Sequence, residues 1–174
     1  MTAIDNTPIN KNFLSPLNFK FQIKRAPHIN FFIQRVNIPS IRLPQISIPT
    51  EFLAIPTTGT KPEYGEFSIQ FKVDEDFENY LEIHNWLRAL GFPDNYGEYK
   101  QIASQPEYTG NGLRSDLSLI VLNAIKNPNF EIVLRDAFPT YISELNFDTT
   151  QQDVEYMTAT ATFSYILFNI QKIS

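Results

Sequence analysis

A regular two-residue alternation near the C-terminal end constrains the fold of this chain more than any other feature. Within residues 154–170, apolar side chains alternate with hydroxyl-bearing ones. Successive side chains of a β-strand point to opposite faces, so the pattern predicts one long strand with two unlike faces, of which one is buried. The apolar face comprises Met157, Ala159, Ala161, Phe163, Tyr165 and Leu167, and the hydroxylated face comprises Thr158, Thr160, Thr162 and Ser164.

Other segments also have the alternation or composition of β-strands. The chain contains 15 Phe and 8 Tyr, and such an excess of aromatic residues favours pleated, half-buried surfaces. Two of the segments flank the Asn-Pro-Asn sequence at 127–129, which predicts a hairpin. We therefore predict a mainly β fold, an antiparallel β-sandwich or barrel of about seven strands with one flanking α-helix. The further strand segments are residues 17–25, 31–38, 66–73, 116–124 and 130–137.

The predicted helix spans residues 77–90. Acidic residues at 74–76 precede it and suit the positive end of a helix dipole, while Gly91 and Pro93 form a strong stop signal. Apolar and aromatic side chains recur at helical spacing, which predicts one buried stripe. The stripe comprises Phe77, Tyr80, Leu81, His84 and Leu87, widened by Ile83, Trp86 and Leu90.

Residues 39–56 form a proline-rich, apolar segment with prolines at 39, 44, 49 and 56. Proline lacks the N–H donor that a central strand requires, so we predict either an edge strand or an arm that lies on another surface. An uncovered apolar run of this kind promotes aggregation, which favours a covered arm. Its apolar side chains are Ile41, Leu43, Ile46, Ile48 and Phe52.

Loop signals divide the remainder of the chain. Gly and Pro predict a loop at residues 57–65 and a long loop at 94–112, of the kind that is functional or flexible. Residues 1–13 are polar and predict a flexible N-terminal arm. No linker or internal repeat divides the rest, so we expect residues 14–174 to form one domain.

Composition excludes several classes of protein. Cysteine is absent, which removes disulfides and cysteine-ligated metal sites. The net charge of −5 disfavours tight binding of nucleic acid, although passing contact with DNA stays compatible with it. The sequence has no apolar stretch long enough to span a bilayer and no signal-peptide pattern at its start, so we expect no membrane span.

Candidate catalytic and metal-binding groups are few. The two histidines, His28 and His84, lie far apart in the sequence, and His84 falls on the helix stripe, which favours a packed side chain. Gly-containing residues 109–112 are better explained by a turn than by an anion site. We find no phosphate loop, nucleophile elbow or zinc motif, so we predict a non-enzymatic protein without a cofactor.

Two groups of carboxylates leave alternatives open. Acidic residues at 74–78 match either a helix cap or a cation site, and the missing calcium-loop spacing favours the cap. Asp136 with Asp148 or Glu144 matches a general acid–base pair by residue type, but nothing in the sequence brings these residues together.

The order of these elements resembles the tail tube protein family of contractile-tailed, myovirus-type phages. No one motif carries the resemblance, which runs over about residues 14–168 as an ordered series. It consists of LNFKFQIKR at 17–25, FFIQRVNIPSI at 31–41, a strand, acidic turn and Trp-containing helix at 66–87, GEYK at 97–100, a strand, Phe-Pro turn and "SEL" segment at 130–148, and VEYMTATATFSYILF at 154–168.

The resemblance implies a β domain that closes into hexameric rings, which stack into a tube through which DNA passes without specific binding. The partners would be other copies of the chain, the tail sheath, and baseplate or terminator proteins, in a virion tail assembled in the host cytoplasm. In this setting we expect Thr158, Thr160, Thr162 and Ser164 to face the lumen, and the apolar side chains of residues 39–56 to contact a neighbouring subunit.

Three classes of function remain open at this point, and the first is a structural ring subunit of the tail tube, with the repeating subunit placed ahead of an initiator or terminator ring. The compact size of the chain favours the repeating tube subunit, whereas the proline-rich segment suits a ring that meets several partners, such as a baseplate tube-initiator or a tube terminator. A monomeric binding module of the same fold is the second class. A small β-fold enzyme is the third, and no group of residues supports it.

Overall fold

β9 (Pro128–Ile142) connects two groups of antiparallel strands. The computed structural model describes residues 12–91, 96–104, 112–150 and 156–173. In this part of the chain a seven-stranded sheet has the order β1-β8-β9-β10-β7-β2, and β11 also pairs with β9. The other strands of the sheet are β1 (Phe19–Ile23), β2 (Ile33–Val36), β7 (Phe67–Lys72), β8 (Ser115–Leu122), β10 (Thr158–Ser164) and β11 (Leu167–Lys172).

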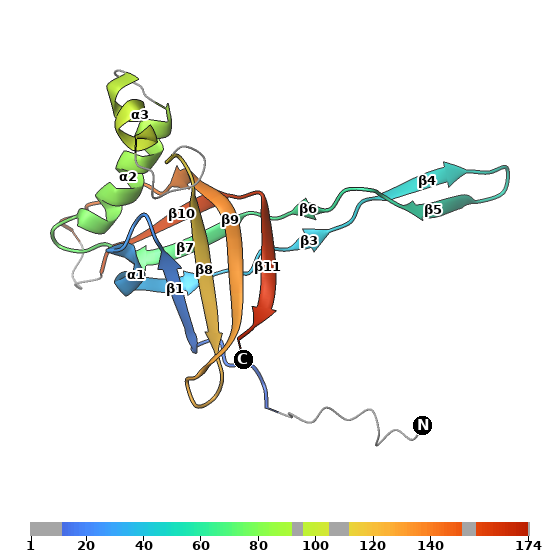
Figure 1. Cartoon of the computed structure of the whole chain (residues 1–174), viewed down its shortest axis with the longest axis horizontal. Coiled ribbons are helices and arrows are strands. Elements are labelled where there is room, and N and C mark those ends of the chain that lie inside the picture. Colours follow the sequence, from blue (N-terminus) through green and yellow to red (C-terminus); the bar gives the residue numbers. More distant parts are fainter. Residues whose placement is uncertain (1–11, 92–95, 105–111, 151–155, 174) are drawn as a thin grey trace.

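The two halves of β9 have different partners. Its first half pairs with β8 and β11, and its second half pairs with β10. Asp136 lies between them with φ 54, and its backbone N–H donates to Asp116 Oδ1 at 3.0 Å. The chain bends there, so that one group of strands crosses the other (Figure 1). The mainly β, antiparallel fold predicted from the sequence is confirmed, but the predicted strand at 130–137 and Phe-Pro turn at 138–139 are one continuous strand.

The long alternating segment is two strands, not one. β10 ends at Ser164 and β11 begins at Leu167, because the chain leaves the second half of β9 and returns along its first half. Residues 154 and 155 lie outside the described residues. The assignment of faces within β10 is nevertheless correct, since the apolar side chains are buried and the hydroxylated ones point away from the core. The buried side chains are Ala159, Ala161 and Phe163.

The core lies where the two groups of strands face each other. Phe163 packs on Phe67 and on Trp86, with ring centroids 6.3 and 6.1 Å apart. The indole N–H of Trp86 donates to Leu113 O at 2.9 Å, so its polar group is satisfied in the core. The largest apolar side chains at the centre of the core are Phe67, Phe71, Phe163, Ile23, Ile29, Ile69, Ile83, Leu117 and Leu134.

α2 (Glu78–Gly91) is the main helix and covers the core, as the sequence predicts, but the predicted stripe is rotated. Ile83 and Trp86 are buried as predicted, but Leu81 is exposed, and Asn79 and Ala89, which the stripe did not include, are buried. The cause is Asn79, whose side-chain amide donates to Lys72 O at 2.8 Å and thereby orients the first turn toward β7. A pattern of apolar residues gives no indication that a polar residue such as Asn79 is buried and connects the helix to a strand.

Two shorter helices were not predicted. α1 (Ile29–Phe32) occupies the start of the segment predicted as a strand at 31–38, because the Asn30 side chain bonds both backbone groups of Ile23 and closes a tight turn. α3 (Tyr96–Ala103) lies within the predicted loop 94–112. Residues 92–95 and 105–111 lie outside the described part, and the latter include the predicted turn residues 109–111. No helix in the described ranges is both long and apolar enough for a membrane span.

The predicted hairpin is confirmed, with its turn earlier than the Asn-Pro-Asn sequence. β8 and β9 pair up to Leu122 and Pro128, so the turn comprises residues 123–127. Asn123 organises it: its side-chain oxygen accepts the N–H groups of Ile125 at 3.0 Å and Asn127 at 2.9 Å. Pro128 is therefore the first residue of the strand, a position that needs no donor.

Replacement of Phe163 tests the position of the core. We expect Phe163→Ala to lower the free energy of unfolding by about 3–5 kcal/mol, because it leaves a cavity between Phe67 and Trp86. Urea denaturation checks this, with Ile125→Ala in the exposed turn as the control. A loss for Phe163→Ala no larger than that of the control would contradict this description of the core.

A candidate assembly surface

The proline-rich segment forms the outgoing side, the tip and the start of the returning side of a hairpin that projects from the body (Figure 1). Near the body, β3 (Ile41–Arg42) pairs with β6 (Glu63–Tyr64), and farther out β4 (Gln45–Pro49) pairs with β5 (Ala54–Thr58). The predicted loop 57–65 was therefore wrong in part, since it supplies the end of β5 and all of β6. Both strands of a two-stranded ribbon are edges, so prolines fit where a central strand would exclude them.

The hairpin has one apolar face. The register places Ile48 opposite Ile55 and Ile46 opposite Thr57, so these side chains lie on the same face of the ribbon. Phe52 and Leu53 follow at the tip, 96% and 69% exposed. All five residues predicted to contact a subunit lie in this hairpin and are exposed, namely Ile41, Leu43, Ile46, Ile48 and Phe52. The described part of the chain does not cover them.

An aromatic clamp holds the base of the hairpin. The Tyr165 hydroxyl donates to Gly65 O at 2.7 Å, and the rings of Tyr64, Tyr165 and Phe168 contact one another. Burial raises the pKa of the Tyr165 hydroxyl, and Tyr64 adds to the effect, so this group stays protonated and able to donate. The clamp connects the hairpin to the bend between β10 and β11.

Two glycines allow the hairpin strands to approach closely. Gly59 N–H donates to Pro44 O at 2.7 Å, and Gly65 N–H donates to Ser40 O at 2.8 Å. A Cβ atom at Gly59 would meet the Pro44 carbonyl, and one at Gly65 would meet the Ser40 hydroxyl. A side chain at Gly59 would force the strands apart, because it would meet backbone, whereas one at Gly65 would first displace the Ser40 hydroxyl.

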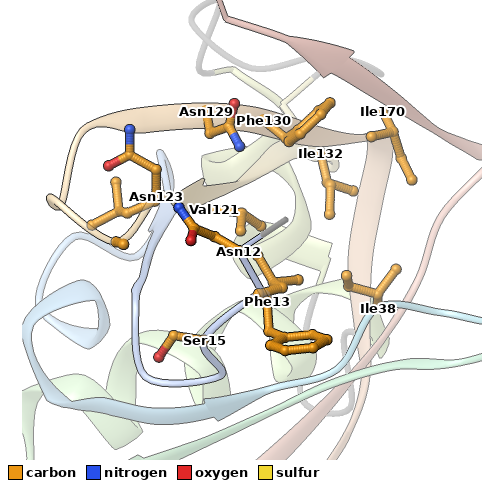
Figure 2. Close-up of a pocket in the computed structure, with 13 residues that line it drawn as sticks. Asn12, Phe13, Ser15, Ile38, Val121, Asn123, Asn129, Phe130, Ile132 and Ile170 are labelled. Carbon is orange, nitrogen blue, oxygen red and sulfur yellow. The ribbon is translucent and has the colours of Figure 1, made fainter. Parts of the chain in front are cut away.

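An apolar groove of about 450 Å³ opens beside the base of the hairpin. Figure 2 shows its side chains around one opening, with Phe13 from the N-terminal segment and Ile38 from the segment that leads into the hairpin. Val121, Ile132 and Ile170 come from β8, β9 and β11. They lie on the core side of these strands, at the end that β7 and β10 leave uncovered. The groove is thus an open continuation of the core.

The hydroxylated side of β10 belongs to a polar surface. Thr158 lies opposite Lys72, Thr160 opposite Gln70 and Thr162 opposite Ser68. The amide of Gln70 donates to the Thr158 hydroxyl at 3.5 Å. Thr160 and Thr162 are half-buried, and Thr158 is exposed. The surface is therefore rich in hydroxyl and amide groups, and its orientation in any assembly stays a prediction.

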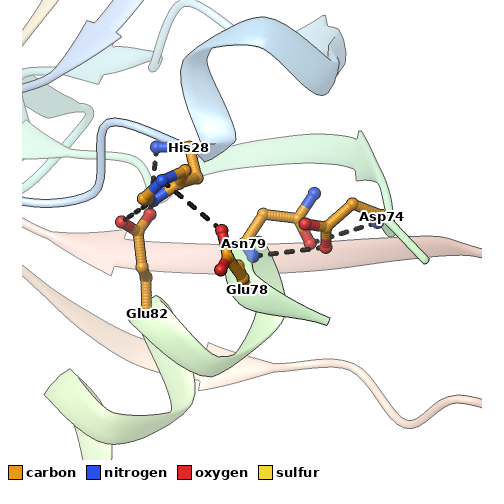
Figure 3. A network of polar contacts seen from close by, with 5 residues as sticks. All are labelled: His28, Asp74, Glu78, Asn79 and Glu82. Atoms are coloured by element: carbon orange, nitrogen blue, oxygen red, sulfur yellow. Dashed lines mark hydrogen bonds and ion pairs between the residues drawn. The ribbon is translucent and has the colours of Figure 1, made fainter. Parts of the chain in front are cut away.

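A polar network that the sequence analysis missed joins the turn before α1 to α2 (Figure 3). His28 Nδ1 lies 2.6 Å from Glu82 Oε1, and His28 Nε2 lies 3.5 Å from Glu78 Oε2. The backbone N–H of His28 also donates to Glu82 Oε2 at 3.2 Å. The hydrogen bond and the charge of Glu82 raise the pKa of His28. His28 and Glu82 are 54 positions apart in the sequence, so no local sequence motif reveals this network.

The acidic turn caps α2. Asp74 Oδ1 accepts the backbone N–H of Asn79 at 3.3 Å, and the Asn79 side chain accepts the N–H of Asp74 at 3.4 Å.

The other candidate residues lie in separate places. Asp148, considered above for acid–base chemistry, accepts both the N–H and the hydroxyl of Thr150, which lowers its pKa. Asp136 lies at the bend of β9. His84 stacks on Tyr80 with ring centroids 6.5 Å apart.

Solved structures share this fold. The anti-feeding prophage tube terminating cap aligns with a TM-score of 0.59 and 13% identity, covering 99% of this chain and 100% of that chain. The sheath/tube terminator of the extracellular contractile injection system PVC aligns with a TM-score of 0.59 and 14% identity, covering 93% and 99%. The anti-feeding prophage baseplate structure also aligns at 0.59, with 14% identity and coverage of 88% and 90%. The fold is therefore a tube-type β fold that occurs in contractile injection systems.

The chain belongs to the phage tail tube protein family, whose model matches residues 8–171. It is also 28% identical over 148 residues to the tail tube terminator protein of Enterobacteria phage T4, covering 80% of this chain and 76% of that protein. The family resemblance inferred from the sequence is confirmed.

The clamp at the base of the hairpin can be tested by removing one oxygen atom. We expect Tyr165→Phe to lose the hydrogen bond to Gly65, lowering the free energy of unfolding by about 0.5–1.5 kcal/mol. Amide hydrogen exchange within residues 41–64 should accelerate, while exchange in β8 stays unchanged. Tyr141→Phe, at an exposed tyrosine, is the matched control. Unchanged exchange in the hairpin of Tyr165→Phe would show that the clamp does not hold it.

The His28 network predicts a pH dependence. A raised pKa in the folded state means that the folded protein holds the His28 proton more tightly than the unfolded chain does. The network therefore stabilises fully below about pH 6.5, the ordinary pKa of histidine, and this contribution is lost as pH rises through the higher folded-state pKa. We expect the difference in unfolding free energy between wild type and His28→Gln to decrease as pH rises through the folded-state pKa of His28. Glu82→Gln should weaken the same dependence, and a difference that does not vary with pH would contradict it.

Proposed function

We propose that this protein is a structural, non-enzymatic subunit of the ring that terminates the tail tube of a contractile phage. The observation that carries the proposal is its 28% identity over 148 residues to the T4 tail tube terminator protein. The fold shared with a tube terminating cap and a sheath/tube terminator supports it. The repeating tube subunit, which the sequence analysis placed first, has less support because the relative named at this level of identity is a terminator.

A terminator has a simple physical requirement. A subunit that stacks head to tail on its own copies makes an interface that propagates into a filament. A terminator must match the last tube ring on one face and must not offer a second matching face to further tube subunits. We propose that this chain forms one hexameric ring that meets this requirement and sits between the end of the tube and the sheath or head-side components of the tail.

The polar surface of β10 fits the wall of a DNA channel. We propose that Thr158, Thr160, Thr162 and Ser164 face the lumen, with Ser68 and Gln70 of β7 beside them. Hydroxyl and amide side chains form weak, sequence-independent contacts, so DNA can slide past them without being held. The opposite side of β10 is buried in the core, which leaves this side free for a lumen.

The projecting hairpin supplies the surface for subunit contact. Its apolar face would be an aggregation site in an isolated monomer, so a partner that covers it is part of the proposal.

A baseplate ring is the second candidate function, and the alignment with the anti-feeding prophage baseplate structure at a TM-score of 0.59 favours it. In either role the protein would be a virion component assembled in the host cytoplasm.

Controlled tube growth tests the terminator proposal. We expect the purified protein to bind the ends of tubes grown from the cognate tube subunit and to stop their elongation, so that tube length under the electron microscope ceases to increase. The protein alone should not grow long tubes. Serum albumin at the same concentration is the control. Spontaneous growth of long tubes, or a virion copy number that corresponds to many stacked rings, would assign the repeating-subunit role instead.

A further inference from the structure

His28 joins a short segment of the chain to the main helix. The segment, residues 24–32, contains the turn after β1 and all of α1, and Ile29 anchors it in the core at 0% exposure. The backbone N–H and the ring of His28 both contact Glu82, and the other ring nitrogen faces Glu78 (Figure 3). These contacts hold the start of α1 against the first turns of α2.

The charge of the His28 ring decides whether both ring contacts are attractive. A protonated ring has an N–H on each nitrogen, so Nδ1 donates to Glu82 Oε1 at 2.6 Å while Nε2–H faces Glu78 Oε2 at 3.5 Å. A neutral ring keeps one N–H, and the lone pair of its other nitrogen then faces a carboxylate oxygen. Either neutral tautomer therefore makes one contact repulsive and leaves two like charges, one helical turn apart, without compensation.

The charged groups that act on His28 are acidic. Glu82 contributes most, through its hydrogen bond and its charge, and Glu78 and Asp74 add to the effect, so the pKa of His28 is raised. The four residues of α1 carry no titratable side chain. The His28 side chain is 55% exposed, so its ring can exchange a proton directly with water.

The basic side chains of the neighbouring elements lie elsewhere. Arg25, in the turn after β1, lies over the Trp86 ring with its guanidinium carbon 5.1 Å from the centroid. Lys72, at the end of β7, has its ammonium group 4.0 Å from the centroid of the Tyr156 ring. Lys24 is exposed. In the described ranges, the ion pairs of the two carboxylates on α2 are both with the histidine.

α1 leads directly into β2, which is an edge strand. β2 lies at the end of the strand order and pairs with β7, with a shift of register between Ile33 and Arg35. Asn37 fixes its C-terminal end, because the side-chain oxygen of Asn37 accepts the N–H of Ser68 at 2.6 Å. The N-terminal end of β2 is continuous with α1, so the contacts of His28 with α2 restrain that end.

We propose that His28, Glu78 and Glu82 form a pH-operated latch on the edge of the sheet. With His28 protonated, the latch holds α1 and the start of β2 against α2 and β7. When His28 loses its proton, this segment opens locally while the core stays folded. Contacts between exposed ionisable groups are weak, so the response is a local opening and not global unfolding. β2 borders the polar surface of β7 and β10, and the latch controls how firmly that edge is paired.

Amide hydrogen exchange at several pH values tests the latch. After correction for the intrinsic exchange rate at each pH, protection of residues 28–36 in the wild type should fall about two- to fivefold between about pH 5.5 and about pH 8.5. Protection of β8 should not change. His28→Gln should show the low protection at every pH. His84→Gln removes the other histidine, which lies on α2, and should behave as the wild type does.

Glu78→Gln distinguishes the latch from a simple ion pair. The amide introduced at this position can donate to the lone pair of a neutral His28 ring, so it replaces a repulsive contact with a hydrogen bond. Residues 28–36 of this variant should therefore be more protected at high pH than those of the wild type. Titration of the imidazole by NMR should give a lower pKa for His28 in Glu78→Gln and in Glu82→Gln than in the wild type.

Three results would overturn the latch. Protection of residues 28–36 that falls with pH equally in the wild type and in His28→Gln would show that another group titrates. An equal fall in β8 would show global destabilisation in place of local opening. Lower protection at high pH in Glu78→Gln than in the wild type would show that the Glu78 contact stays attractive when the ring is neutral. None of these measurements involves tube ends, so they leave the terminator proposal to its own test.

Discussion

The bend in β9 at Asp136 determines how the other parts of the molecule are arranged. One strand that pairs first with β8 and β11 and then with β10 holds the two groups of strands across one core. The same change of partner forces the chain to turn between Ser164 and Leu167. Tyr165 lies in this turn and reaches Gly65 at the base of the hairpin. The direction of the hairpin therefore depends, through a short series of contacts, on a bend in the middle of the sheet.

In this arrangement the residues that stabilise the folded body differ from those that form the exposed hairpin and groove. The buried aromatic core and the cap on α2 stabilise the body and leave the hairpin and the groove exposed. An isolated copy then presents two apolar surfaces to water, at a cost that association can recover. None of the described residues that line the groove is charged, so shape and apolar contact have to provide specificity there. The His28 network acts elsewhere, on the contact between α2 and the turn before α1.

The period of two residues allowed the faces of β10 to be predicted correctly, because alternation is a property of each strand alone. It did not show where strands end, since Ser164 and Leu167 belong to different strands only through their partners on β9. The segment at 57–65 has a loop composition, yet its residues pair with Ile41, Arg42, Gln45 and Ile46 because a two-stranded ribbon tolerates Pro and Gly. The stripe on α2 was rotated by the hydrogen bond from Asn79 to Lys72, a contact that no apolar pattern contains.

By itself, the sequence determined the mainly β class, the buried side of β10, the position of the main helix, and the ordered series of segments that identified the family. These follow from local periodicity and from the residue types that turns and caps require. Only the tertiary structure decided that the proline-rich residues form a projecting hairpin, that Tyr165 clamps it, that His28 meets Glu82, and that an open groove lies beside the hairpin base. Each of these depends on contacts between residues far apart in the chain. Such contacts arise from the packing of the whole core, which no local segment of the sequence encodes.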